Sequence, residues 1–213
     1  MDGESGMGNG RSRQAIHDDY DGAEQALRIE LRTLWDEVDD LWEQQQSSDG
    51  FHGYVSADYE AVFRSLVHLR GQARTFLEWG SGLGVVTIMA SRLGFEAYGI
   101  ENEPELVDHA HAFGERFAPA ARFVRGNFFP SEFTWNPGEG EIEVRTALPG
   151  AAAYERMGRK LSDFDLVYAY PWPGEHQLYQ KVMRKYGGPN SLFLTYDVRR
   201  GMELYRGGRP STR

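Results

Sequence analysis

The chain contains no cysteine among its 213 residues. A disulfide framework, a zinc site built on thiolates and a cysteine nucleophile are therefore excluded. The chain also lacks any apolar run near the roughly 18 residues that a membrane-spanning helix needs. The segment Met1–Arg13 is polar and rich in Gly and Ser, without the apolar centre of a signal peptide. We therefore expect a soluble, cytoplasmic protein that does not act at a membrane.

Positive charge is scarce as well, and the formal net charge is −9 at neutral pH. Because contact with a phosphate backbone needs a basic face, we do not expect nucleic acid as a partner. Hydrophobic residues make up 40% of the chain and aromatic residues 13%, which is enough to build a folded core. The length fits one domain with a modest extension.

The first fifty residues divide into two parts. Residues 1–20 are predicted to be a disordered tail, because Gly, Ser, Asn and charged residues leave little to bury. Residues 21–50 are predicted to hold one amphipathic helix, from Ala23 to Gln46, that packs its apolar stripe on the rest of the chain. That stripe consists of Leu27, Leu31, Leu34, Val38 and Leu41. Residues 51–213 are predicted to form the main domain, in which a second helix begins with Ser56 as its N-cap.

From residue 75 onward, short apolar runs alternate with amphipathic segments. Strands are predicted at Thr75–Trp79, Ala97–Ile100, Arg122–Val124, Asp165–Tyr170, Ser191–Tyr196 and, as a last short edge strand, Met202–Tyr205. Helices are predicted at Val85–Leu93, from Pro104 onward, and around Leu178–Tyr186. Residues 130–160 interrupt the alternation, and we expect an inserted hairpin or lid there. The pattern predicts an α/β fold with a doubly wound, mostly parallel sheet.

The most informative segment is Phe76–Gly84, with the sequence Phe-Leu-Glu-Trp-Gly-Ser-Gly-Leu-Gly between a strand and a helix. Three glycines at alternate positions allow a tight turn and let a ligand approach the backbone. In a doubly wound sheet this turn lies at the carboxyl ends of the strands, where ligands bind. Glu101 ends the second strand, 17 residues after Gly84. A carboxylate at that place is able to accept both hydroxyls of an adenosine ribose.

The spacing of these glycines argues against a dinucleotide ligand. Dinucleotide-binding enzymes favour Gly-x-Gly-x-x-Gly, with the pyrophosphate at the helix N-terminus. Here Glu78 precedes a Gly-x-Gly-x-Gly run. Its carboxylate would repel a pyrophosphate but suits an ammonium or sulfonium ligand. An NAD-type oxidoreductase is therefore the less favoured alternative.

These residues resemble the first motif of the class I methyltransferases, the seven-β-strand, Rossmann-like enzymes that use S-adenosylmethionine (SAM). The resemblance covers about residues 52–200 and implies SAM as the cofactor. It implies that Glu78 lies near the methionine amino group and that Glu101 holds the ribose hydroxyls. The further cofactor contacts that it implies are Gly80, Ser81, Gly82, Gly84, Asn102, Asn127 and Phe128. Asn127 departs from the family, which often has an acidic residue near the adenine at this place.

The segment after the fourth strand, residues 170–176, has the sequence Tyr-Pro-Trp-Pro-Gly-Glu-His. In the family that it resembles, this region meets both the methyl group and the acceptor. Tyr170 and Trp172 offer aromatic faces that stabilise cations, and Glu175 and His176 are candidates to take a proton or to orient a nucleophile. The run is similar to the Asp/Asn-Pro-Pro-aromatic motif of amino-group methyltransferases, but Tyr170 replaces its polar first residue. A loop that is merely shaped by prolines is the alternative.

Tyr54 is a further candidate, within the aromatic segment Phe51–Ser56. In several lysine methyltransferases of this fold such a segment closes over the cofactor, so the resemblance implies a lid contact for Tyr54. Ordinary packing is the alternative. No metal is expected, because His109 and His111 lie two positions apart on a predicted helix and do not share a face.

Taken together, these features predict methyl transfer from SAM to an N or O atom of a small molecule or a protein side chain. In-line transfer from a sulfonium mainly requires that donor and acceptor be held in line, so few catalytic residues are obligatory. A non-catalytic SAM-binding module or partner subunit would carry the same glycine turn and is the second alternative.

Overall fold

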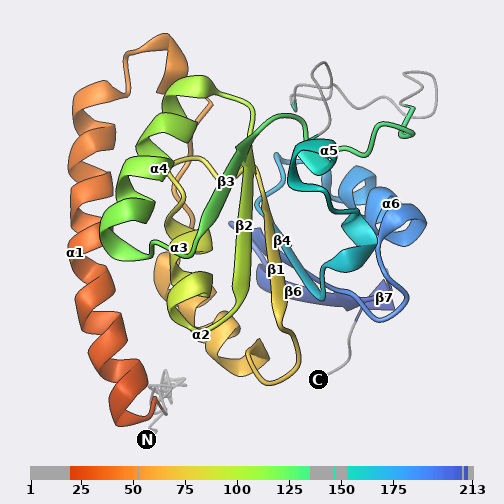
Figure 1. The fold of residues 1–213 in the computed structure, drawn as a ribbon, viewed down its shortest axis with the longest axis horizontal. Helices are drawn as coiled ribbons and strands as arrows, with labels where there is room; N and C mark the ends of the chain where they lie inside the picture. The colour runs from red at the N-terminus through yellow and green to blue at the C-terminus, as the bar shows by residue number, and fades with distance from the viewer. Residues whose placement is uncertain (1–19, 52, 135–145, 147–152, 208, 211–213) are drawn as a thin grey trace, which may run out of the picture.

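A computed structural model describes residues 20–51, 53–134, 146, 153–207 and 209–210 (Figure 1). The helices are α1 (Gly22–Gln45), α2 (Tyr59–Leu69), α3 (Val85–Arg92), α4 (Pro104–Phe117), α5 (Ala153–Met157) and α6 (His176–Tyr186). The strands are β1 (Thr75–Trp79), β2 (Glu96–Glu101), β3 (Arg122–Arg125), β4 (Leu166–Ala169), β5 (Leu192–Asp197), β6 (Gly201–Arg206) and β7 (Arg209–Pro210). Short 3-10 turns lie at Asp49–Phe51 and Leu161–Asp163.

The strands form one sheet in the order β3-β2-β1-β4-β5-β6-β7. Strands β1 to β5 pair in parallel, whereas β6 is antiparallel to β5 and β7 is antiparallel to β6. The predicted α/β fold with a doubly wound, mostly parallel sheet and an N-terminal helix is therefore confirmed. The strand order reverses between β1 and β4, and in such sheets ligands bind beside this point.

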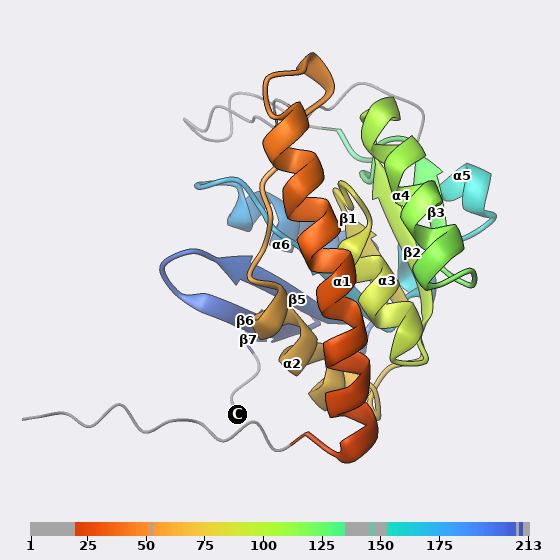
Figure 2. The ribbon, with the colours of Figure 1, turned by 90° about the vertical axis from the view of Figure 1, so that its left-hand side faces the viewer.

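Helices cover both faces of the sheet. Helices α1 to α4 lie on one face, and α5 and α6 lie on the other (Figure 1). Turning the molecule shows α1 crossing over α3, with α2 and α4 to either side (Figure 2). Helix α1 begins with a capping box, in which Asp21 and Glu24 each accept a hydrogen bond from the other's backbone N–H. Its residues Leu31, Leu34 and Val38 are fully buried, so the predicted stripe packs on the domain.

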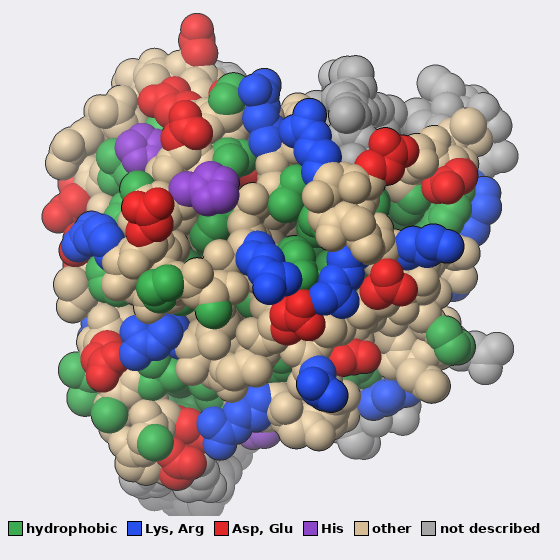
Figure 3. Space-filling view, in the orientation of Figure 1, with side chains coloured by type: hydrophobic (Ala, Val, Ile, Leu, Met, Phe, Trp, Pro, Cys, Tyr) green, Lys and Arg blue, Asp and Glu red, His purple; other side chains and the backbone are tan. Residues whose placement is uncertain are grey.

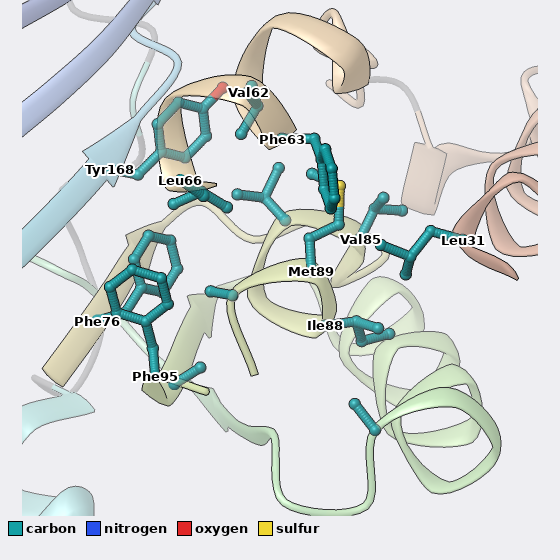
Figure 4. Close-up of a cluster of buried hydrophobic side chains, with 14 of the residues drawn as sticks. Leu31, Val62, Phe63, Leu66, Phe76, Val85, Ile88, Met89, Phe95 and Tyr168 are labelled. Atoms are coloured by element: carbon teal, nitrogen blue, oxygen red, sulfur yellow. The ribbon is translucent and has the colours of Figure 1, made fainter. Parts of the chain in front are cut away.

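The core has two halves because successive residues of a strand point to opposite faces. In β1, Phe76 belongs to the half beneath α1 to α4, while Leu77 belongs to the half beneath α6. Tyr168 of β4 lies in the first half with Phe76, Leu66 of α2 and other apolar side chains (Figure 4). Side chains and helices therefore cover both faces of the sheet, and the carboxyl ends of its strands remain available for a ligand site.

Two predictions about local structure are wrong, and a third lies mostly outside the described residues. The N-cap of α2 is Asp58, whose Oδ1 accepts a hydrogen bond of 3.0 Å from the backbone N of Ala61, so the assignment of Ser56 was wrong. Strand β6 is not the edge strand, because β7 pairs beyond it. Of the predicted 130–160 insertion, residues 135–145 and 147–152 lie outside the described residues, as does most of the predicted tail. The described part of that insertion includes α5.

Charges of both signs are interleaved on the face seen in Figure 3. Within the described residues, no helix has the length and apolar character needed to cross a bilayer.

Candidate cofactor site

A cavity of about 1100 Å³ opens at the carboxyl ends of the parallel strands. Its wall is formed by the turns after β1, β2, β3, β4 and β5, together with Tyr54, Val55 and the start of α2. This is the crevice that a doubly wound sheet offers to ligands. The structure brings every candidate residue to this cavity except Gly84 and Glu175.

The glycine turn after β1 needs left-handed backbone conformations. The φ angles of Gly80, Gly82 and Gly84 are 69°, 51° and 82°. A side chain at Gly80 would meet nothing within 4 Å, so the backbone there is open to the cavity. A Cβ at Gly82 would lie 2.6 Å from the ring of Tyr54. The turn therefore presents bare backbone to a ligand, with Tyr54 packed against one side.

Gly84 does not line the cavity, contrary to the expected ligand contact. A Cβ at this position would lie 2.7 Å from the ring of Phe123 and 3.0 Å from Cβ of Ala110. The glycine is needed because α4 and β3 pack closely against the start of α3. Its role is to let the turn approach its neighbours.

Glu101, at the end of β2, is tied to the glycine turn. One carboxylate oxygen accepts a hydrogen bond of 2.9 Å from the backbone N of Gly82. The other accepts from the backbone N of Asn102 at 2.6 Å and of Glu103 at 2.9 Å. The carboxylate is half-buried in the cavity wall. It is thus held in place by the backbone at the position where the sequence predicts a ribose.

Glu78 occupies a different environment. Its side chain is buried, and Oε2 accepts hydrogen bonds from the backbone N of Thr87 at 2.9 Å and from its hydroxyl at 2.6 Å. Oε1 makes no hydrogen bond to any described residue. Burial raises the pKa of Glu78 to about 8, although the bonds from Thr87 oppose that rise. A cation beside Oε1 would stabilise the ionised carboxylate.

Asn127 and Phe128 follow β3. The side-chain oxygen of Asn127 accepts a hydrogen bond of 2.8 Å from the backbone N of Phe129. The ring of Phe128 stacks on Trp79, with centroids 5.1 Å apart and an interplanar angle of 14°. Both candidates therefore reach the cavity from a well-packed loop, and Asn102 of the preceding turn lines the same cavity.

Tyr54 closes one side of the cavity. Its hydroxyl lies 2.8 Å from the hydroxyl of Tyr59, and its ring contacts Gly82. Burial raises the pKa of the Tyr54 phenol, so it stays protonated at neutral pH. The neighbouring His52 lies outside the described residues.

The far end of the cavity, near the ends of β4 and β5, is aromatic and charged. Tyr170 and Trp172 line the wall there, and Tyr170 packs edge to face against Tyr196 with ring centroids 5.1 Å apart. His176, the first residue of α6, has its Nε2 3.5 Å from Oδ2 of Asp197. The backbone N–H groups of Arg199 and Arg200 donate to Asp197 and hold its pKa below the usual range.

Glu175 is fully buried and does not line the cavity, contrary to the expected acid or base role. Its carboxylate accepts hydrogen bonds from the backbone N and the hydroxyl of Thr146. That hydroxyl also lies 2.9 Å from the hydroxyl of Tyr179. Glu175 therefore positions Thr146 in the cavity wall and does not face an acceptor.

Cavity residues that were not predicted from the sequence include Tyr168, Asp197 and Arg199. Asp197 and Arg199 carry a usable signal, because they follow the fifth predicted strand and strand ends meet at one edge of the sheet. Tyr168 carries no such signal, since a tyrosine inside an apolar strand is typical of core. Within the described residues, no cluster of His, Asp and Glu is placed to hold a metal ion.

Comparisons with known proteins give structural likeness alone. No protein-family model matches the chain, and no curated relative is found. An RNA methyltransferase from Salinibacter ruber, solved with S-adenosyl-L-homocysteine (SAH), is 18% identical with a TM-score of 0.48, over 72% of this chain and 92% of that one. An O-methyltransferase from Bacillus cereus, also with SAH, is 15% identical with a TM-score of 0.46, over 87% and 70%.

A TehB-like SAM-dependent methyltransferase from Corynebacterium glutamicum is 15% identical with a TM-score of 0.41, over 75% of this chain and 70% of that one. All three likenesses concern the fold.

Proposed function

We propose that this chain is a SAM-dependent methyltransferase that transfers a methyl group to an N or O atom of a small molecule or a protein side chain. One observation carries the proposal: Glu78, the glycine turn and Glu101 converge on a single cavity at the switch point of the sheet. The hydrogen bond from Gly82 to Glu101 joins the last two directly.

The cavity fits a nucleoside ligand with a cationic end. Its volume of about 1100 Å³ is slightly above the about 300–1,000 Å³ typical of small-molecule sites, which leaves room for a second molecule. The open backbone at Gly80 allows close approach. The hydroxyl of Ser81 is buried and has no partner among the described residues, so the turn holds a free polar group.

Electrostatics favours SAM over a dinucleotide. The buried carboxylate of Glu78 lies directly before the turn, where a dinucleotide enzyme would bind pyrophosphate. Two negative groups at that place would repel each other, whereas an ammonium or sulfonium would pair with Glu78.

In this assignment Glu101 accepts hydrogen bonds from the ribose hydroxyls, and Asn102, Asn127 and Phe128 surround the adenine. SAM supplies a methyl group that its sulfonium makes electrophilic. Tyr170 and Trp172 orient the acceptor at the other end of the cavity. His176 takes a proton from an acceptor that must lose one, and Asp197 stabilises the protonated imidazole.

The ribose assignment is tested by calorimetric titration of Glu101→Gln and Glu101→Ala with SAH. The Gln variant keeps an oxygen for the backbone N–H groups of Asn102 and Glu103 but loses the negative charge. We expect SAH to bind about tenfold or more weakly to both variants, and more weakly to the Ala variant. The control is Glu115→Gln on the exposed side of α4, which should bind SAH like the unsubstituted chain. Unchanged affinity in both Glu101 variants would contradict the assignment.

Methyl transfer itself separates an enzyme from a non-catalytic SAM-binding module. The chain is incubated with cell extract and SAM that carries a tritiated methyl group, and incorporation is counted. We expect labelled product that Glu101→Ala largely abolishes and Glu115→Gln does not. If Glu101→Ala incorporated as much label as the unsubstituted chain, this result would argue against an enzyme.

A further inference from the structure

Tyr168 of β4 is a buried tyrosine whose hydroxyl has no hydrogen-bond partner among the described residues. The side chain is only 2% exposed, yet the residue lines the cavity. Figure 4 shows its ring in the core, with the hydroxyl directed toward the part of the cluster where Val62 of α2 lies. A buried hydroxyl without a partner destabilises the fold, and phenylalanine would fill the same space without that penalty.

The position of Tyr168 in the sheet suggests what the hydroxyl is for. Tyr168 pairs in register with Glu78 on the neighbouring parallel strand, so the two side chains lie on the same face. Burial raises the pKa of the Tyr168 phenol well above its ordinary value, and the charge of Glu78 adds to the rise. The hydroxyl therefore remains protonated and acts as a donor.

Together, the two side chains offer complementary groups. Glu78 presents Oε1 as an acceptor, and Tyr168 presents an O–H donor. A negatively charged acceptor and a hydroxyl donor on paired residues match a zwitterion, with its ammonium at Glu78 and its carboxylate at the Tyr168 hydroxyl.

On the basis of the proposed function above, we propose that Tyr168 is a specificity-determining residue whose hydroxyl hydrogen-bonds the carboxylate of the amino-acid end of SAM. The hydroxyl is left without a protein partner because the ligand provides one.

The test compares two ligands on Tyr168→Phe by calorimetry. SAH carries the amino-acid group, whereas 5′-methylthioadenosine has the same nucleoside without the ammonium and carboxylate. We expect the Kd for SAH to rise about tenfold or more, because a hydrogen bond to a charged group is lost. The Kd for 5′-methylthioadenosine should stay unchanged. The unliganded variant should melt about 2–4 °C higher, since an unpaired buried hydroxyl has been removed.

Thr195→Val is the matched control. The Thr195 hydroxyl is also buried and without a partner among the described residues, but Thr195 does not line the cavity. Its removal should leave both affinities unchanged. An unchanged Kd for SAH in Tyr168→Phe, or an equal loss for both ligands, would overturn the role of Tyr168. Failure of the unsubstituted chain to bind either ligand would instead overturn the proposed function, and this role with it.

Discussion

Glu78 and Glu101 are two carboxylates of one cavity that the fold treats differently. Glu101 is half-buried and accepts hydrogen bonds from three backbone N–H groups, which orient its oxygens. Glu78 is buried, is bonded only by Thr87 among the described residues, and has a pKa of about 8. The first carboxylate is therefore a fixed acceptor, whereas the second changes its charge near neutral pH.

The raised pKa of Glu78 makes the unliganded fold less stable as pH rises. The unfolded chain loses this proton near the ordinary pKa of 4.5, whereas the folded chain keeps it until about pH 8. The stabilisation that comes from the neutral carboxyl is therefore complete below the pKa of the unfolded chain, and it is lost as the pH rises through the pKa of the folded chain. We therefore compare the free energy of unfolding of Glu78→Gln with that of the unsubstituted chain. We expect this difference to shift in favour of Glu78→Gln by about 1–3 kcal/mol as the pH rises from about 5 to about 8. Denaturant titrations at both pH values measure this gain, and a difference that does not change with pH would contradict it.

Ligand binding should show the opposite dependence. A ligand ammonium pairs with ionised Glu78, so SAH should bind more tightly as pH rises from about 6 to about 8, with proton release at the lower pH. Titrations in two buffers that differ in ionisation enthalpy count the released protons. Glu78→Gln should release none, and equal proton release from both proteins would remove Glu78 from the ligand site.

At the scale of elements, the strand–helix turn combines two kinds of glycine. Gly80 faces open space at the cavity, whereas Gly84 faces Phe123 and Ala110. Both have positive φ angles, so an alanine strains the backbone at either position.

We expect Gly84→Ala to lower the free energy of unfolding by about 2–4 kcal/mol, because backbone strain and steric overlap add. Gly80→Ala should cost only about 1–2 kcal/mol but should reduce SAH binding strongly. Denaturant unfolding and calorimetry of both variants check this contrast. Similar stability losses would show that the close packing around Gly84 is relieved easily.

Elements with strong periodicity were predicted from the sequence within one or two residues. Thr75–Trp79 and the helix from Pro104 follow from an apolar run and from proline at a first helical position. The N-cap of α2 was misassigned because Ser56 and Asp58 are both good caps, and only the tertiary structure decides between them. The short strand β7 has two residues and no periodicity from which to predict it.

The site was predicted only in part, for a physical reason. Glu78, Gly80 and Glu101 lie at strand ends in a local pattern, so the chain order alone brings them together. Glu175 was placed wrongly because its burial depends on Thr146, 29 residues earlier. Tyr168 was missed because the absence of a hydrogen-bond partner is a property of the folded core and leaves no trace in the sequence.

At the scale of the whole molecule, α1 is an integral part of the domain. Leu34 on its inner face is fully buried, whereas Ile29 on its outer face is 59% exposed. We expect Leu34→Ala to lower the unfolding free energy by about 2–5 kcal/mol and Ile29→Ala to change it by less than about 0.5 kcal/mol. Chemical denaturation measures both. Equal, small effects would mean that α1 is a separable arm.

The three-layer architecture leaves the carboxyl ends of the strands for a ligand. The carboxylates of Glu78 and Glu101 at these ends favour a ligand with a cationic group over a dinucleotide. We propose that this ligand is SAM. The most direct test is calorimetric titration of the full chain with SAH, and with NAD as the control ligand. We expect saturable binding of SAH at one site per chain and no binding of NAD. Binding of NAD alone, or of neither ligand, would contradict it.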